Sequence, residues 1–244
     1  QITREAYHAI GGAVGALANR ADEVYKGLSS EGEELAHQMF MRLVTLGEGA
    51  EDTRRRATQA ELLLLTDNTD LMEEIIDQFA AYRLLSLDHD SETRQPIVEV
   101  AHEAILREWD RLRGWINDSR TELRLQRQLT GLVADWEKAN KDKSYLLRGA
   151  RLDQFEAWAR GTTLTLTPTE KLFLQASISE QSVIQAAEQA RQQREIRLEK
   201  RSQQRLRYLV GVLALLALAA VVFSIFAVDR EQKTQDALTE AESA

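Results

Sequence analysis

Residues 84–110, LLSLDHDSETRQPIVEVAHEAILREWD, contain the pattern that decides the fold. Two short β-like runs, 84–87 and 96–101, enclose a polar and turn-rich segment, an arrangement typical of a β-hairpin. The apolar residues that follow recur at helical spacing: Ile105, Leu106, Trp109, Leu112 and Trp115. The stretch therefore predicts a hairpin followed directly by one helix over about 102–116.

Three amphipathic helices are predicted before this hairpin. The first covers 31–46, and its apolar face comprises Leu35, Met39, Leu43 and Leu46. Thr58 and Glu61 form a capping-box pattern that opens a short apolar run, and Asp70 begins the third helix. The order helix, helix, helix, hairpin, helix is that of a winged-helix domain, which we place at 29–117.

The C-terminal half is also predicted to be helical. A helical adaptor is expected over 118–166, and TPTE at 167–170 is a strong helix start, with Pro at the first helical position. No Pro or Gly follows before Gly211, so one helix could continue to residue 228. The predicted fold class is mainly α: a winged-helix domain with a small β-hairpin, a helical adaptor, one long helix and a single transmembrane helix.

A stretch of 21 residues without charge runs from Tyr208 to Val228 and contains Gly211. As a helix it would be roughly 31 Å long, which matches the hydrocarbon core of a bilayer. The basic flank before it favours a transmembrane helix at 208–228 over the alternative of a buried core helix. A freely diffusing soluble protein is therefore disfavoured.

Charge is segregated around this stretch. Residues 1–187 carry 22 basic and 31 acidic groups, residues 188–207 carry seven and three, and residues 229–244 carry two and five. The long juxtamembrane helix at 167–207 thus ends in a basic block, and the positive-inside rule places 1–207 in the cytoplasm and the C-terminus outside. We expect a basic collar to attract anionic lipid headgroups. The collar comprises Arg197, Lys200, Arg201, Arg205 and Arg207.

The sequence offers no catalytic or metal-binding constellation. With no Cys it has no disulfide framework, thiolate zinc site or cysteine nucleophile. The glycine-rich piece GGAVGA at 11–16 lacks the Lys-Ser/Thr of a phosphate-binding loop. His102-Glu103 begins like a zinc-protease motif, but the second His is absent. We therefore predict no catalytic residue and no metal site.

Nucleic acid is a disfavoured partner. The helix that would enter a DNA groove begins at Asp70 and carries Glu73, Glu74 and Asp77 against the single basic Arg83. Phosphate recognition needs a basic surface, and this one would repel it. The three arginines at 54–56 precede the helix pair and are interpreted as a solvated or acid-paired surface.

The segment VEVAHEAILREW at 98–109 resembles the winged-helix end of STAND-type regulatory NTPases. The likeness is strongest to bacterial, membrane-linked members whose C-terminal part is a WD-repeat β-propeller. It covers most of residues 5–180. Supporting stretches are GGAVGALANRADEVY, LVTLGEGAEDTRRRAT, RGW, YLLRGARL and LTPTEKLFLQAS, at 11–25, 43–58, 113–115, 145–152 and 166–177.

The resemblance implies a nucleotide-sensing role for His102 and Glu103. In the family, a winged-helix His within Met-His-Asp contacts the diphosphate of bound ADP and helps to hold the resting state. His102 matches this His and Glu103 matches the acid, whereas Ala101 replaces the Met. An imidazole at a helix start lies where the helix dipole favours an anion. The alternative is that His102 only caps or packs the junction of hairpin and helix.

The resemblance also implies further parts of the same chain. Two short helices around Gly11-Gly12, within 1–28, would be the helical end of an upstream P-loop NTPase core that holds ATP or ADP with magnesium and hydrolyses ATP or GTP. Residues 229–244 would be an acidic linker to a WD-repeat domain. The chain begins at Gln1, and we expect it to be an excerpt. The expected partners are the bilayer, these two domains and, in an oligomer, further copies.

Two other functions stay open. One is a membrane-anchored winged-helix transcription regulator. The other is a non-enzymatic helical scaffold or interaction protein in which 168–207 forms a coiled-coil stalk, although its apolar residues do not keep a clean heptad.

Overall fold

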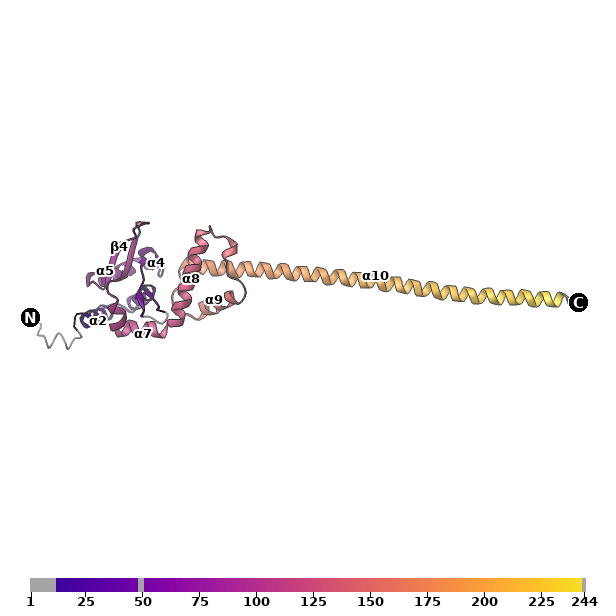
Figure 1. The fold of residues 1–244 in the computed structure, drawn as a ribbon, viewed down its shortest axis with the longest axis horizontal. Helices are drawn as coiled ribbons and strands as arrows, with labels where there is room; N and C mark the ends of the chain where they lie inside the picture. The colour runs from indigo at the N-terminus through magenta and orange to yellow at the C-terminus, as the bar shows by residue number, and fades with distance from the viewer. Residues whose placement is uncertain (1–11, 48–50, 243–244) are drawn as a thin grey trace, which may run out of the picture. The chain divides into compact units, whose positions relative to one another are not determined.

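The computed structural model describes residues 12–47 and 51–242, which are mainly helical, with two small antiparallel sheets (Figure 1). The chain divides into two compact units between Gln181 and Ser182. Of the two helices predicted within 1–28, the second is present and the first falls outside the described residues. The helices and strands are, in chain order, α2 (Gly12–Lys26), α3 (Ser30–Arg42), β1 (Val44–Thr45), β2 (Thr53–Arg54), β3 (Ala57–Thr58), α4 (Gln59–Leu63), α5 (Thr69–Ala81), β4 (Leu85–His89), β5 (Pro96–Val100), α6 (Ala104–Glu108), α7 (Asp110–Asp118), α8 (Arg120–Lys138), a 3₁₀ turn (Lys143–Tyr145), α9 (Gly149–Gly161) and α10 (Pro168–Glu242).

Helix α3 is shorter than its apolar pattern suggested. The predicted helix over 31–46 ends at Arg42, and Leu46 lies beyond the strand β1 that follows. Arg127 of α8 explains the early end, because its guanidinium donates to the main-chain oxygens of Met41, Arg42 and Val44. A side chain thereby satisfies carbonyls that a further helical turn would otherwise have bound.

The predicted hairpin is present as β4 and β5, with Leu85 opposite Val100 and His89 opposite Pro96. A third strand, β3, pairs antiparallel with β5 through Ala57 and gives the order β3-β5-β4. Two residues are too short for an alternating pattern to be recognised, so the sequence did not predict β3.

The single helix predicted over 102–116 is instead two helices, α6 and α7, which meet at Trp109. The ψ of Trp109 is 97°, an extended value that ends α6. Its indole is 2% exposed and packs edge-on against Phe40 with ring centroids 5.0 Å apart. The apolar spacing therefore predicted correctly which residues are buried but wrongly predicted one unbroken helix. A single extended residue between two helices does not change the spacing of the apolar residues.

Two apolar cores form within the first unit. The first core, centred on Phe40, Phe79 and Trp109, joins α2 to α7 and the β4–β5 hairpin. The second core is centred on Phe155 and Phe173 and joins α8, α9 and the start of α10. Helix α8 contributes to both, because Leu123 belongs to the first core and Leu129 to the second.

The second unit consists of α10 from Ser182 onward. Among the described residues, Pro168–Val221 is a helix long and apolar enough to cross a membrane. Its most apolar 18-residue window has a mean hydropathy of 1.6 and contains no buried residue. Tyr208 and Gly211 are exposed, and α10 continues through Val228 to Glu242. The stretch 208–228 is therefore helical as predicted, whereas its place in a membrane and its orientation stay predictions.

Candidate functional site

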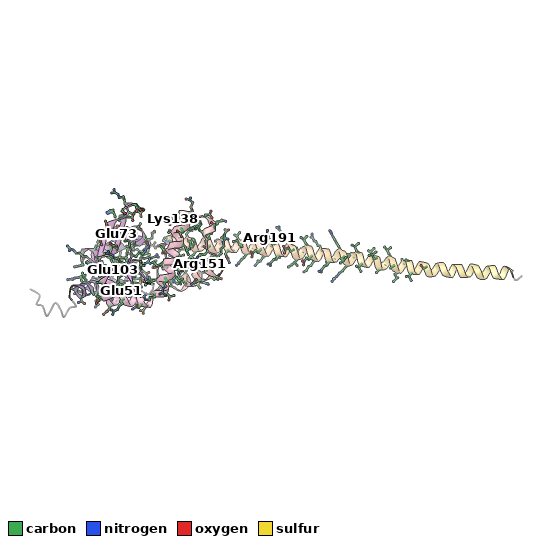
Figure 2. The ribbon with its side chains drawn as sticks, in the orientation of Figure 1. Glu51, Glu73, Glu103, Lys138, Arg151 and Arg191 are labelled. Atoms are coloured by element: carbon green, nitrogen blue, oxygen red, sulfur yellow. The ribbon has the colours of Figure 1, made fainter. Side chains whose placement is uncertain are left out.

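His102 lies on the surface between β5 and α6. Its side chain is exposed, and its main-chain oxygen accepts the N–H of Ile105 at 3.0 Å. Glu103, labelled in Figure 2, is also exposed and precedes the first residue of α6 without a side-chain capping bond. The ring of His102 is therefore accessible to a ligand presented from outside the described residues.

The arginines at 54–56 pair with glutamates, and one of them also contacts the residue before His102. Arg54 donates to the main-chain oxygen of Ala101 at 3.2 Å and lies 3.6 Å from Glu99, which also pairs with Arg56 at 3.2 Å. Arg55 makes a two-pronged pair with Glu61, both bonds 2.9 Å long. The interpretation of this arginine run as an acid-paired surface is thus confirmed.

The other histidines have separate settings. His37 has a side chain 18% exposed, and its ring centroid lies 4.7 Å from that of Trp115. Burial lowers the pKa of His37, an effect that Glu34 opposes only in part. His89 is exposed on β4, and His8 falls outside the described residues. The described residues contain no cluster of His, Asp and Glu that could hold a metal ion.

A buried ion pair that sequence reasoning missed joins α3 to α10. Arg42 is 1% exposed and donates to both carboxylate oxygens of Glu170, at 2.8 and 2.7 Å. Glu170 is 2% exposed and also accepts the hydroxyl of Thr130 at 2.8 Å. We call Gln38, Arg42, Arg127, Thr130 and Glu170 the polar junction.

Glu170 also forms hydrogen bonds that cap the start of α10. The N–H of Thr167 donates to its carboxylate at 2.8 Å, and its own N–H donates to the hydroxyl of Thr167 at 3.3 Å. This reciprocal pair is a complete capping box, as TPTE predicts. Burial alone would raise the pKa of Glu170, but the bonds from Arg42, Thr167 and Thr130 outweigh it and lower the pKa. The carboxylate is therefore charged at neutral pH.

Arg127 completes the polar junction from α8. Its Nη2 lies 2.7–2.8 Å from the main-chain oxygens of Met41 and Arg42 at the end of α3 and of Val44 in β1. Burial, followed by the like charges of Arg55 and Arg42, lowers the pKa of Arg127 to about 9. Within the described part of the chain, Arg127 Nη1 and Arg42 Nε are buried without a hydrogen-bond partner. Arg127 thus holds its charge at a cost that its hydrogen bonds do not fully offset, in contrast to Glu170.

Of the residues in the polar junction, the sequence pointed only to Glu170. Glu170 stood out as the third residue of a capping box, so its position was predicted but not its second partner. Arg42 lies 128 residues away and sits beside an apolar helical face, where a lone arginine is ordinarily solvated. Only the three-dimensional fold brings the two residues together.

The basic collar lies in the second unit. Arg197, Lys200 and Arg201 are exposed on α10, as are Arg205 and Arg207. Arg191, labelled in Figure 2, projects from the same helix farther from the apolar stretch. All of these guanidinium and ammonium groups can therefore meet a charged surface.

Comparison with known protein families identifies a relationship. A family model described as Novel STAND NTPase 1 matches residues 1–144, which is more than half of the chain and includes His102 and Arg42. Neither a curated protein nor a solved structure matched the chain.

Proposed function

Because this chain belongs to the Novel STAND NTPase 1 family, we propose that it is the nucleotide-state-sensing and membrane-anchoring segment of a STAND-type signalling NTPase. In this proposal it links an upstream ATP- or GTP-hydrolysing core to a C-terminal WD-repeat domain. The observation that carries the proposal is the Arg42–Glu170 pair. It fastens the start of α10, which lies beyond the family match, to a helix within that match.

Winged-helix identity is part of this proposal. The order α3, α4, α5, β4, β5 supports it, as does the strand order β3-β5-β4, in which a short strand before α4 pairs with the second strand of the hairpin. The exposed face of α5 carries Asp70, Glu73 and Asp77. That acidic face argues against a DNA-reading role for the domain.

His102 is proposed to read the nucleotide together with Glu103. ADP held by an upstream core would supply a diphosphate, an anion that a protonated imidazole or its N–H can bind. The exposure of His102 fits a contact made across a domain boundary. A contact made in only one nucleotide state shifts the balance between two domain arrangements, which is what a switch requires.

The basic collar and the apolar stretch are proposed to anchor the segment in a bilayer. Residues 1–207 would lie in the cytoplasm and the C-terminus outside, since seven basic groups precede the apolar stretch within residues 188–207. The exposure of the collar side chains supports a contact with anionic headgroups.

The sensing role is tested in the full-length protein loaded with labelled ADP. We expect His102→Ala to speed ADP release by about tenfold, which corresponds to the loss of one charge-assisted hydrogen bond. His89→Ala is the matched control, because His89 is an exposed histidine of the same domain. Equal release from both variants and from the wild type would remove the sensing role.

A further inference from the structure

The linker 162–167 is bound by α3 through its main chain. Gln38 donates to the oxygen of Thr163 at 3.0 Å and accepts the N–H of Thr165 at 2.8 Å. One helical turn later, Arg42 donates to the oxygen of Thr165 at 2.7 Å. Two side chains spaced four residues apart thus hold an extended segment much as a neighbouring strand would.

The same Arg42 also holds the first turn of α10. Its pair with Glu170 and the capping box of Thr167 share one carboxylate. If Glu170 separates from Arg42, the capping box at the start of α10 is weakened. If the first turn of α10 unravels, the Arg42–Glu170 ion pair is weakened. The bonds of the linker and those of the helix start are coupled through Arg42 and Glu170.

Polar contacts dominate where the linker and α10 meet α3. The linker places Leu164 in the first core, whereas Leu166 and Phe173 belong to the second. Between these apolar anchors the contacts are the hydrogen bonds and charges of Gln38, Arg42 and Glu170. Such contacts can be exchanged for water, unlike a continuous apolar interface.

We propose that residues 162–174, the linker and the first turns of α10, form a latch on α3 that opens and closes as one unit, with Gln38 and Arg42 as the receiving residues and the Arg42–Glu170 pair as its lock. The role of this latch in signalling rests on the proposed function, since through the latch a movement of the nucleotide-sensing domain would change the position of the start of α10. The cooperative opening of 162–174 is a separate claim that holds without any signalling role.

Charge makes the latch all-or-none. In a half-open arrangement, Glu170 would stay buried without the guanidinium of Arg42, and Arg42 would keep only Glu61, whose carboxylate lies 3.7 Å away. That arrangement is less favourable than either the paired state or the fully hydrated state. In the described part of the chain, the buried Nε of Arg42 lacks a hydrogen-bond partner, so the closed state already leaves one donor of Arg42 unsatisfied. Intermediates are therefore depleted relative to the closed and open states.

Hydrogen exchange on the whole chain in lipid nanodiscs tests this proposal. We expect Glu170→Gln to raise the exchange rate of amides at 163–174 at least tenfold, with those amides exchanging together. Exchange in peptides from α5 and from the middle of α9 should rise by a clearly smaller factor, because these helices lose only their core contacts with Leu164, Leu166 and Phe173. Glu180→Gln is the matched control, because it removes a carboxylate of the same helix whose partner is the exposed Lys143, and it should leave exchange unchanged.

Gln38→Ala is a second variant that leaves no buried charge unpaired. It removes the two linker bonds made by Gln38 and leaves the bond from Arg42 to Thr165. It is expected to raise exchange over the whole of 163–174, the first turn of α10 included. If it raised exchange only at Thr165, the bonds would be independent and the latch would be disproved. The same conclusion follows if Glu170→Gln left 163–174 unchanged, or if it raised α5 and α9 by the same factor.

This experiment needs no nucleotide, so its result is separate from the sensing role. If 163–174 exchanges as one unit but His102→Ala does not change ADP release, the latch is supported and the sensing role is excluded. If His102→Ala speeds ADP release but 163–174 does not exchange as one unit, the sensing role is supported and the latch is excluded.

Discussion

Leu164 and Leu166 lie two residues apart in the linker, yet their side chains pack in different apolar cores. Both are buried, at 3% and 8% exposed. Between them the N–H of Thr165 donates to the side-chain oxygen of Gln38, and the main-chain oxygen of Thr165 accepts from the guanidinium of Arg42. The linker is thus the point at which the two cores meet the polar junction.

This arrangement predicts that truncating the two leucines loosens different helices. We expect Leu164→Ala and Leu166→Ala each to lower the free energy of unfolding by about 2–5 kcal/mol. Hydrogen exchange should rise more in α5 than in α9 for Leu164→Ala, and the reverse for Leu166→Ala. The same exchange pattern in both variants would mean that the cores are one cooperative unit.

The Arg42–Glu170 pair is predicted to contribute specificity more than stability. Arg42→Met should cost about 3–5 kcal/mol, because it leaves Glu170 buried without its counter-ion. Glu170→Leu should cost less, because the carboxylate of Glu61 stays 3.7 Å from Arg42. The double variant should recover most of that loss, since two apolar side chains replace the pair.

Urea unfolding followed by tryptophan fluorescence measures this coupling. All four tryptophans lie in the first unit: Trp109, Trp115, Trp136 and Trp158. Losses that simply add in the double variant would show that the two side chains do not interact, contrary to their 2.7 Å contact.

Much of the fold was predictable because apolar spacing records burial. Ile75, Ile76 and Phe79 are buried on α5 as their spacing predicts, and the hairpin follows from two β-like runs around a polar turn. Spacing does not record where a helix stops for a tertiary reason. Hence the extended Trp109 and the early end of α3, which Arg127 caps from another helix, appeared only in the structure.

The polar junction was less predictable for a related reason. A capping box is local and pointed to Glu170, but a buried ion pair between distant residues has no pattern in one sequence. His102 is the opposite case. A motif singled it out, and the structure adds its exposure and the neighbouring Arg54, which binds the main chain of Ala101.

His37 predicts a loss of stability below neutral pH. Because burial lowers its pKa from the ordinary 6.5, the unfolded chain takes up a proton more readily than the folded chain. The free energy of unfolding should therefore fall as pH drops below about 6.5, by at most about 1.4 kcal/mol per pH unit, until the folded pKa is passed.

His37→Gln should flatten this part of the profile, as measured by urea unfolding between pH 7.5 and 5. His89→Gln serves as the comparison, since it removes an exposed histidine of the same domain. A slope that survives in His37→Gln would assign the effect to other groups.

The basic collar predicts the orientation of the apolar stretch. The chain has no cysteine, so single cysteines at Gln192→Cys and Gln235→Cys can be labelled without background. In intact cells a membrane-impermeant thiol reagent should label residue 235 at least tenfold more than residue 192, because positive charge stays on the cytoplasmic side. Permeabilised cells should label both positions equally.

Replacing Arg205 and Arg207 with Glu should reduce the asymmetry, because it changes the net charge of 188–207 from +4 to zero. Equal labelling in intact cells would show that the apolar stretch does not span the membrane, and preferential labelling of residue 192 would reverse the proposed orientation.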